Sequence, residues 1–188
     1  MNLVARWVSI LGHPFVMVAA MVLGTALRLG TPREALRALA VVALIAVVPV
    51  ALLMVRQVRR GSWTNVDASN QSERPALFAV GIVALVALLA ATLAFQPGSF
   101  LIRGTVGVLI ILAVCAVATR WLKVSLHSAF GGLAATTLLL VGSPAGWLVL
   151  AVLPVLAWSR LALRRHTVPE VLTGFLVGVV SGYAIAGA

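Results

Sequence analysis

The stretch from Ala76 to Phe95 contains no charged residue, and it constrains the fold more than any other part of the chain. A helix of about 20 apolar residues is long enough to cross the hydrocarbon core of a membrane. A helix also pairs its backbone polar groups internally, as a segment surrounded by lipid must. Six further apolar stretches flank this one, at roughly 8–27, 38–55, 99–119, 128–142, 146–158 and 169–187. We therefore expect an all-α, polytopic membrane helix bundle of six or seven spans, formed by a single domain over residues 1–188.

Two of the apolar stretches are short, and a turn-forming segment around Pro144 joins them. They are either two tilted spans or one broken re-entrant pair. The last stretch carries Gly174, Gly178 and Gly182 at a spacing of four. This spacing places the three glycines on one helix face and predicts close packing against a neighbouring helix.

The composition of the chain excludes a soluble enzyme and a nucleic-acid-binding domain with a polar surface. Apolar residues make up 62% of the 188 residues and charged residues only 10%, whereas soluble domains contain about 25% charged residues. The net charge of +10 is typical of loops that contact anionic headgroups. Most Lys and Arg residues fall on the side of the N-terminus, which the positive-inside rule assigns to the cytoplasm.

The scarce ionisable residues gather in three loops, at 56–75, 120–127 and 159–168, and at the start of the helix that follows the last loop. Alternation of the spans brings these loops to one membrane face. They carry His127 and His166 and, counting the helix start, three of the four acids: Asp67, Glu73 and Glu170. This concentration predicts one composite site. The remaining histidine, His13, is expected to lie at the membrane interface without a role.

The third loop shows how such a site works chemically. Pro169 suits the first turn of a helix, which places Glu170 close enough to bond one ring nitrogen of His166. Such a bond fixes the tautomer and makes the other nitrogen a better nucleophile or base. Arg74 and Arg160, with Lys123 as a further cation, are suited to clamp a tetrahedral dianion. No metal or other cofactor is expected, because the arginines would repel a cation.

These residues resemble the signature of the type 2 phosphatidic acid phosphatase (PAP2) superfamily, whose three parts are Lys-x6-Arg-Pro, Pro-Ser-Gly-His and Ser-Arg-x5-His-x3-Asp. The third part matches the segment from Ser159 to Glu170 in full spacing, with Glu in place of Asp. The second part is similar to Val124-Ser125-Leu126-His127. In the first part Arg74-Pro75 is kept, but Asp67 stands at the lysine position.

The resemblance implies a PAP2-like fold and a role for each matching residue. His166 would attack phosphorus and form a phosphohistidine, Glu170 would orient it, and His127 would protonate the leaving oxygen. The phosphoryl oxygens would be bound by Arg74, Ser125 and Arg160. We hypothesise that Lys123 supplies the cation missing at position 67.

The expected function is therefore metal-independent hydrolysis of a lipid phosphomonoester or diphosphate. The candidate substrates are phosphatidate, phosphatidylglycerophosphate and polyprenyl diphosphates. The expected partners are this lipid and the bilayer, without nucleic acid, and the expected location is the inner (plasma) membrane. Two alternatives stay open: a lipid phosphotransferase that uses the same site, and a catalytically degenerate protein that binds lipid phosphates. A transporter fits less well, because its charged groups would lie in the middle of the membrane.

Overall fold

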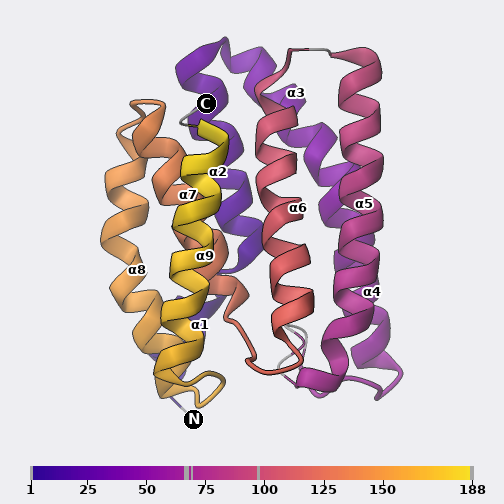
Figure 1. The fold of residues 1–188 in the computed structure, drawn as a ribbon, viewed down its shortest axis with the longest axis vertical. Coiled ribbons are helices and arrows are strands. Elements are labelled where there is room, and N and C mark those ends of the chain that lie inside the picture. The colour runs from indigo at the N-terminus through magenta and orange to yellow at the C-terminus, as the bar shows by residue number, and fades with distance from the viewer. Residues whose placement is uncertain (1, 66–67, 69, 97, 187–188) are drawn as a thin grey trace.

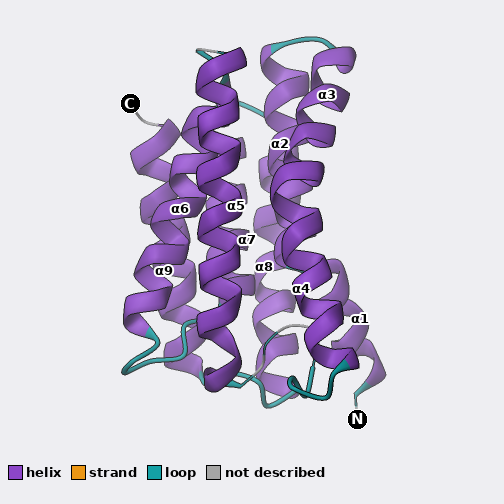
Figure 2. Ribbon diagram, turned by 90° about the vertical axis from the view of Figure 1, so that its right-hand side faces the viewer, coloured by secondary structure: helices purple, strands orange, loops and turns teal. Residues whose placement is uncertain are grey.

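A computed structural model describes residues 2–65, 68, 70–96 and 98–186, and this part of the chain is all-helical. The elements are α1 (Leu3–Leu11), α2 (Pro14–Leu29), α3 (Pro32–Val42), a π-helical turn (Ala43–Val47), α4 (Val48–Arg59), a 3-10 turn (Gln71–Glu73), α5 (Arg74–Phe95), α6 (Phe100–Ala118), α7 (Leu126–Leu140), α8 (Ala145–Ala162) and α9 (Val168–Ala186). The long helices run side by side, with the N-terminus at one end of the bundle and the C-terminus at the other (Figures 1 and 2).

The described helices confirm the predicted all-helical bundle and include helices suited to span a membrane. Five helical segments, Pro32–Arg59, Gln71–Phe95, Phe100–Ala118, Ala145–Ala162 and Val168–Ala186, are long and apolar enough to cross a membrane. The bent pair α1 and α2 makes a sixth if it is counted as one span. This count reaches the lower end of the predicted six or seven. The long first segment stays continuous through the π-helical turn that precedes Pro49.

The first apolar stretch, expected at roughly 8–27, contains a break that the sequence analysis did not predict. The chain breaks between α1 and α2, whose axes differ by 41°. The cause lies in Gly12-His13-Pro14: Gly12 ends α1, the His13 side chain caps α2, and Pro14 takes the first helical position. A proline is favoured at that position because its missing N–H has no helical partner to lose.

Helix α7 lies at the centre of the bundle, in contact with α2, α8 and α9. Every residue from His127 to Leu138 is buried, as expected for a helix that is apolar on all sides. Helices α7 and α8 are therefore two separate helices, and the shorter one is enclosed by protein.

The predicted glycine stripe of α9 packs against α7, as expected. A side chain at Gly178 would collide with the carbonyl oxygen of Ala129, and one at Gly174 with the carbonyl oxygen of Ser125. The close approach holds the start of α9 beside the start of α7, which is the region of the predicted site.

The predicted sidedness of the loops is also confirmed. The N-terminus and the connections α4–α5, α6–α7 and α8–α9 lie at one end of the bundle, at the bottom of Figure 1. The connections α2–α3, α5–α6 and α7–α8 lie at the opposite end. Helices α5, α7 and α9 all begin at the first end, so the positive poles of their dipoles point toward it.

Candidate functional site

The segment from Lys123 to Ser125 holds the three predicted loops together. The guanidinium of Arg74 donates from Nη1 to the carbonyl oxygen of Val124 at 2.7 Å. The backbone N–H of Ser125 donates to the carbonyl oxygen of Glu170 at 3.0 Å. The His166 ring contacts the carbonyl oxygen of Lys123. The prediction that these loops come together is therefore confirmed, and they meet at one end of the bundle.

The hydrogen bonds of His166 determine its tautomer. Its Nδ1 lies 2.9 Å from Oε2 of Glu170 and 3.1 Å from the carbonyl oxygen of Lys123. Since a backbone carbonyl only accepts, and an ionised carboxylate does too, Nδ1 must carry the proton. The lone pair of the neutral ring is then on Nε2, which is the nitrogen able to attack an electrophile.

The surroundings of His166 keep its ring neutral. Burial lowers the pKa of His166 to about 3, and the nearby charges of Arg160, Arg74 and Lys123 act in the same direction. They outweigh the hydrogen bond to the carbonyl oxygen of Lys123, which raises the pKa. Protonation therefore does not remove the Nε2 lone pair at neutral pH.

Glu170 lies in the first turn of α9, as predicted. Its Oε2 accepts from the His166 ring and from the backbone N–H of Thr167 at 3.1 Å. The second bond holds the carboxylate against the start of the helix. The carboxylate therefore keeps the His166 ring in one orientation.

Arg74 and Arg160 bring positive charge to the site, and both are almost fully buried, with exposed fractions of 3% and 1%. Arg74 is the first residue of α5. Arg160 lies in the last turn of α8 and donates from Nη1 to the hydroxyl of Ser9 at 2.5 Å. Both charges lie near enough to His166 to lower the pKa of its ring. Guanidinium groups bind phosphate and carboxylate oxygens well, so their presence makes this end of the bundle suited to an anion.

The two polar residues of the second loop lie in different environments. His127 is the second residue of α7, is buried, and lines the same cavity as Arg74 and His166. Ser125 is fully buried and caps α7, accepting from the backbone N–H of Ser128 at 3.4 Å. The hydroxyl of Ser128 also donates to Ser125 at 3.1 Å. Ser125 is not among the residues that line the cavity.

Lys123 contributes its backbone to the site. Its carbonyl oxygen contacts His166, and its positive charge helps to lower the pKa of that ring. The residue also lines a separate surface hollow together with Arg164 and Arg165.

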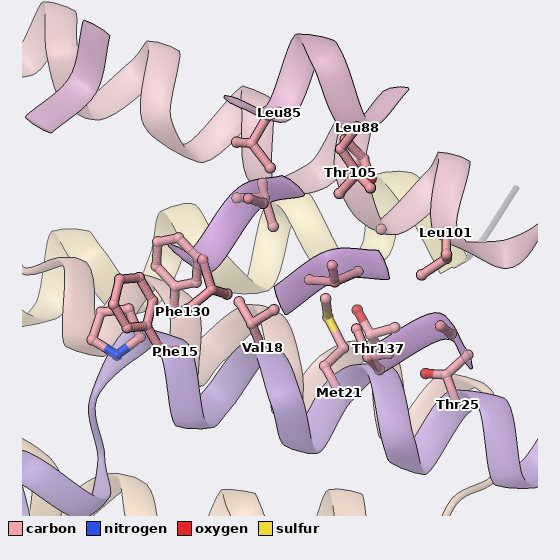
Figure 3. A pocket seen from close by; sticks show the side chains of 18 of the residues that line it. Phe15, Val18, Met21, Thr25, Leu85, Leu88, Leu101, Thr105, Phe130 and Thr137 are labelled. Carbon is pink, nitrogen blue, oxygen red and sulfur yellow. The ribbon is translucent and has the colours of Figure 1, made fainter. Parts of the chain in front are cut away.

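A cavity of about 810 Å³ begins at this site and follows α2 through the bundle. Arg74, His127, Arg160 and His166 line its first end. Its walls are mostly apolar: Phe15, Val18 and Met21 of α2 lie opposite Leu85 and Leu88 of α5 (Figure 3). Its far end reaches Arg37, Gln96 and Arg103 near the opposite face. The size is in the range of ligand pockets, about 300–1,000 Å³.

Two residues at the site were missed by sequence reasoning. Ser9 binds Arg160, and His13 lines the cavity beside His127, with 5.4 Å between the ring centroids. The Gly-His-Pro sequence was the available signal for His13, since it marks a helix end followed by a helix start. No local pattern points to Ser9, because its partner is 151 positions away.

The first loop is organised by Glu73, whose carboxylate is buried. It accepts from the backbone N–H groups of Thr64 and Asn70 at 2.8 and 3.1 Å. These bonds fix the chain immediately before Arg74. Asp67, at the position of the family lysine, lies outside the described residues.

Within the described part of the chain, no group of three or more His, Cys, Asp or Glu side chains is arranged to hold a metal ion. Comparisons with protein-family models, curated proteins and solved structures found no match to this chain.

Proposed function

We propose that this protein is an integral-membrane lipid phosphatase that works through a phosphohistidine at His166. The observation that carries the proposal is the composition of one cavity end. A neutral histidine with its lone pair on Nε2, a second histidine and two buried guanidiniums line the same end of a mostly apolar cavity.

The reaction follows from these groups. Nε2 of His166 attacks phosphorus, an N–P bond forms, and the bond from phosphorus to the leaving oxygen breaks. His127 gives its proton to that oxygen. Water then attacks the phosphohistidine and gives a proton back to His127, the N–P bond breaks, and inorganic phosphate leaves. Arg74 and Arg160 stabilise the charge on the equatorial oxygens.

The cavity supports an amphiphilic substrate. The cationic end suits a phosphate, and the apolar walls suit a hydrocarbon chain. Along α2 the lining residues run from Pro14 to Leu29, and 16 helical residues span about 24 Å. This length approaches the hydrocarbon core of about 30 Å. A long chain can therefore stay surrounded by apolar side chains while its phosphate meets His166.

The resemblance to the PAP2 superfamily supports the same chemistry. The third motif supplies Arg160, His166 and Glu170, which are the residues with the clearest geometry. The second motif departs from the family at Leu126, and Ser125 serves as a helix cap. Phosphate binding is accordingly assigned to Arg74 and Arg160, without Ser125, and the charge of Lys123 adds to the positive potential at His166.

The test is phosphate release by purified protein in detergent, without added metal. Phosphatidate, phosphatidylglycerophosphate and a polyprenyl diphosphate are the substrates, and His166→Asn is compared with the unchanged protein. Asparagine keeps a side-chain amide that can donate to Glu170 but has no nucleophilic ring nitrogen. We expect release to fall to background in this variant, with an unchanged melting temperature.

Three results would contradict the proposal. Release that persists in folded His166→Asn would exclude His166 as the nucleophile. Transfer of the phosphoryl group to a second lipid, without release, would identify a phosphotransferase. Binding of the lipid phosphates without any turnover would identify a binding protein.

A further inference from the structure

His13 lies at the break between α1 and α2, where its side chain caps α2. Its Nδ1 accepts a hydrogen bond from the backbone N–H of Phe15 at 3.3 Å. An accepting nitrogen carries no proton, so the neutral ring carries its proton on Nε2. The cap therefore makes Nε2 a hydrogen-bond donor.

The surroundings of His13 place its ring at the cationic end of the cavity. The ring is half-buried and packs edge-on against Phe15 and His127, at centroid distances of 4.7 and 5.4 Å. It lines the cavity together with Arg74, His127, Arg160 and His166.

The helix before His13 is tied to the same end of the cavity. Ser9 of α1 accepts from Arg160 at 2.5 Å, and α1 packs against α8. The bond to Arg160 fixes α1 at the site, and the cap fixes the ring relative to α2. The break in the first apolar stretch thus brings the imidazole of His13 to the cationic end of the cavity.

We propose that His13 is a phosphate-binding residue, whose Nε2–H donates to an oxygen of the phosphoryl group held by Arg74 and Arg160. This inference rests on the proposed function for the nature of the ligand. A role as helix cap alone accounts for Nδ1, but Ser, Thr, Asp and Asn are the usual capping residues. An imidazole adds a second nitrogen, which the cap does not use.

The cap and the proposed contact can be separated by His13→Asn. Asparagine is among the best N-cap residues and caps through Oδ1, but its shorter side chain has no nitrogen at the position of the ring Nε2. Thr31→Asn is the matched control, because Thr31 caps α3 at the opposite face by accepting from the Glu34 N–H at 3.3 Å. The probe is binding of inorganic phosphate and orthovanadate to the full-length protein in detergent, with melting temperature measured in parallel.

We expect His13→Asn to weaken binding of both anions about tenfold or more, the loss typical of one hydrogen bond to a charged group. Its melting temperature should stay close to that of the unchanged protein, and Thr31→Asn should bind both anions normally. If His13→Asn lowers the melting temperature, His13→Ser is the second variant, because serine also caps helices well.

The proposal is wrong if a folded His13 variant binds both anions as tightly as Thr31→Asn does, or if the unchanged protein binds neither anion. Lipid phosphate turnover in the same samples separates the two proposals. If the unchanged protein shows no turnover but His13→Asn binds the anions more weakly, His13 is an anion-binding residue and the phosphatase proposal is wrong. If His13→Asn keeps normal turnover and normal anion binding, the phosphatase proposal stands and the role of His13 is wrong.

Discussion

His166 has two acceptors for one proton, and only one of them is a side chain. Glu170 accepts at 2.9 Å and the carbonyl oxygen of Lys123 at 3.1 Å. The backbone acceptor does not depend on the identity of residue 123. Two acceptors therefore hold the proton on Nδ1, and the lone pair of the neutral ring stays on Nε2.

This arrangement predicts a limited effect for Glu170→Ala. The Lys123 carbonyl still fixes the tautomer, so the variant loses the orientation and charge supplied by the carboxylate but keeps the nucleophile. We expect phosphate release to fall about 10- to 100-fold, by analogy with the loss seen when a partner that orients a metal-binding histidine is removed. Measurement of kcat beside His166→Asn checks this, and a folded Glu170→Ala protein as inactive as His166→Asn would show that the carbonyl is not sufficient.

Sequence reasoning at this scale succeeds where spacing alone fixes geometry. Glu170 follows His166 by four positions, and a helix start between them brings the two side chains together. Lys123 and Ser125 are different, because the groups that matter there are a backbone carbonyl and a helix cap. Residue type does not reveal either, since the direction of a side chain in a loop depends on contacts with distant elements.

Two elements, α7 and α9, position the two histidines: α7 carries His127, and His166 lies in the loop directly before α9. The spacing of four between the glycines of α9 predicts their close packing, because it places all three on one helix face. The break between α1 and α2 escapes the same reasoning: the stretch 8–27 is apolar on both sides of His13, and hydropathy does not record a change of axis. Capping residues do, and Gly12-His13-Pro14 contains them.

The packing of these elements predicts the effect of Gly178→Ala. The added methyl group would collide with the carbonyl oxygen of Ala129 in α7, a backbone atom that cannot move without the helix. Overpacking of this kind costs about 1–3 kcal/mol, so the melting temperature should fall, and phosphate release should fall with it because α7 carries His127. Gly104→Ala is the control for stability, since its nearest neighbour would be Met21 Cε at 3.8 Å. Equal melting temperatures for the two variants would contradict the role of the glycine stripe.

The whole molecule brings three loops to one face because an even number of helices separates them. Two helices, α5 and α6, lie between Arg74 and His127, and two more, α7 and α8, between His127 and His166. This topology follows from the apolar stretches alone. The cavity does not, because its walls come from all the helices from α2 to α7, and the space between them depends on how side chains far apart in the sequence pack.

The cavity predicts that a change far from His166 alters which substrates are used. Val18 lines the cavity one turn above Phe15, whereas Val16 of the same helix is 45% exposed on the outer surface. Val18→Phe should narrow the apolar part of the cavity, and Val16→Phe should leave it unchanged.

If the substrate chain occupies this space, Val18→Phe should slow phosphate release from a long-chain lipid phosphate about tenfold or more, since loss of a few methylene contacts at about 0.8 kcal/mol each is sufficient. Release from an eight-carbon alkyl phosphate and binding of inorganic phosphate should be spared. Equal losses for long and short chains would mean that the chain lies outside the bundle, in the lipid, and that only the phosphate enters.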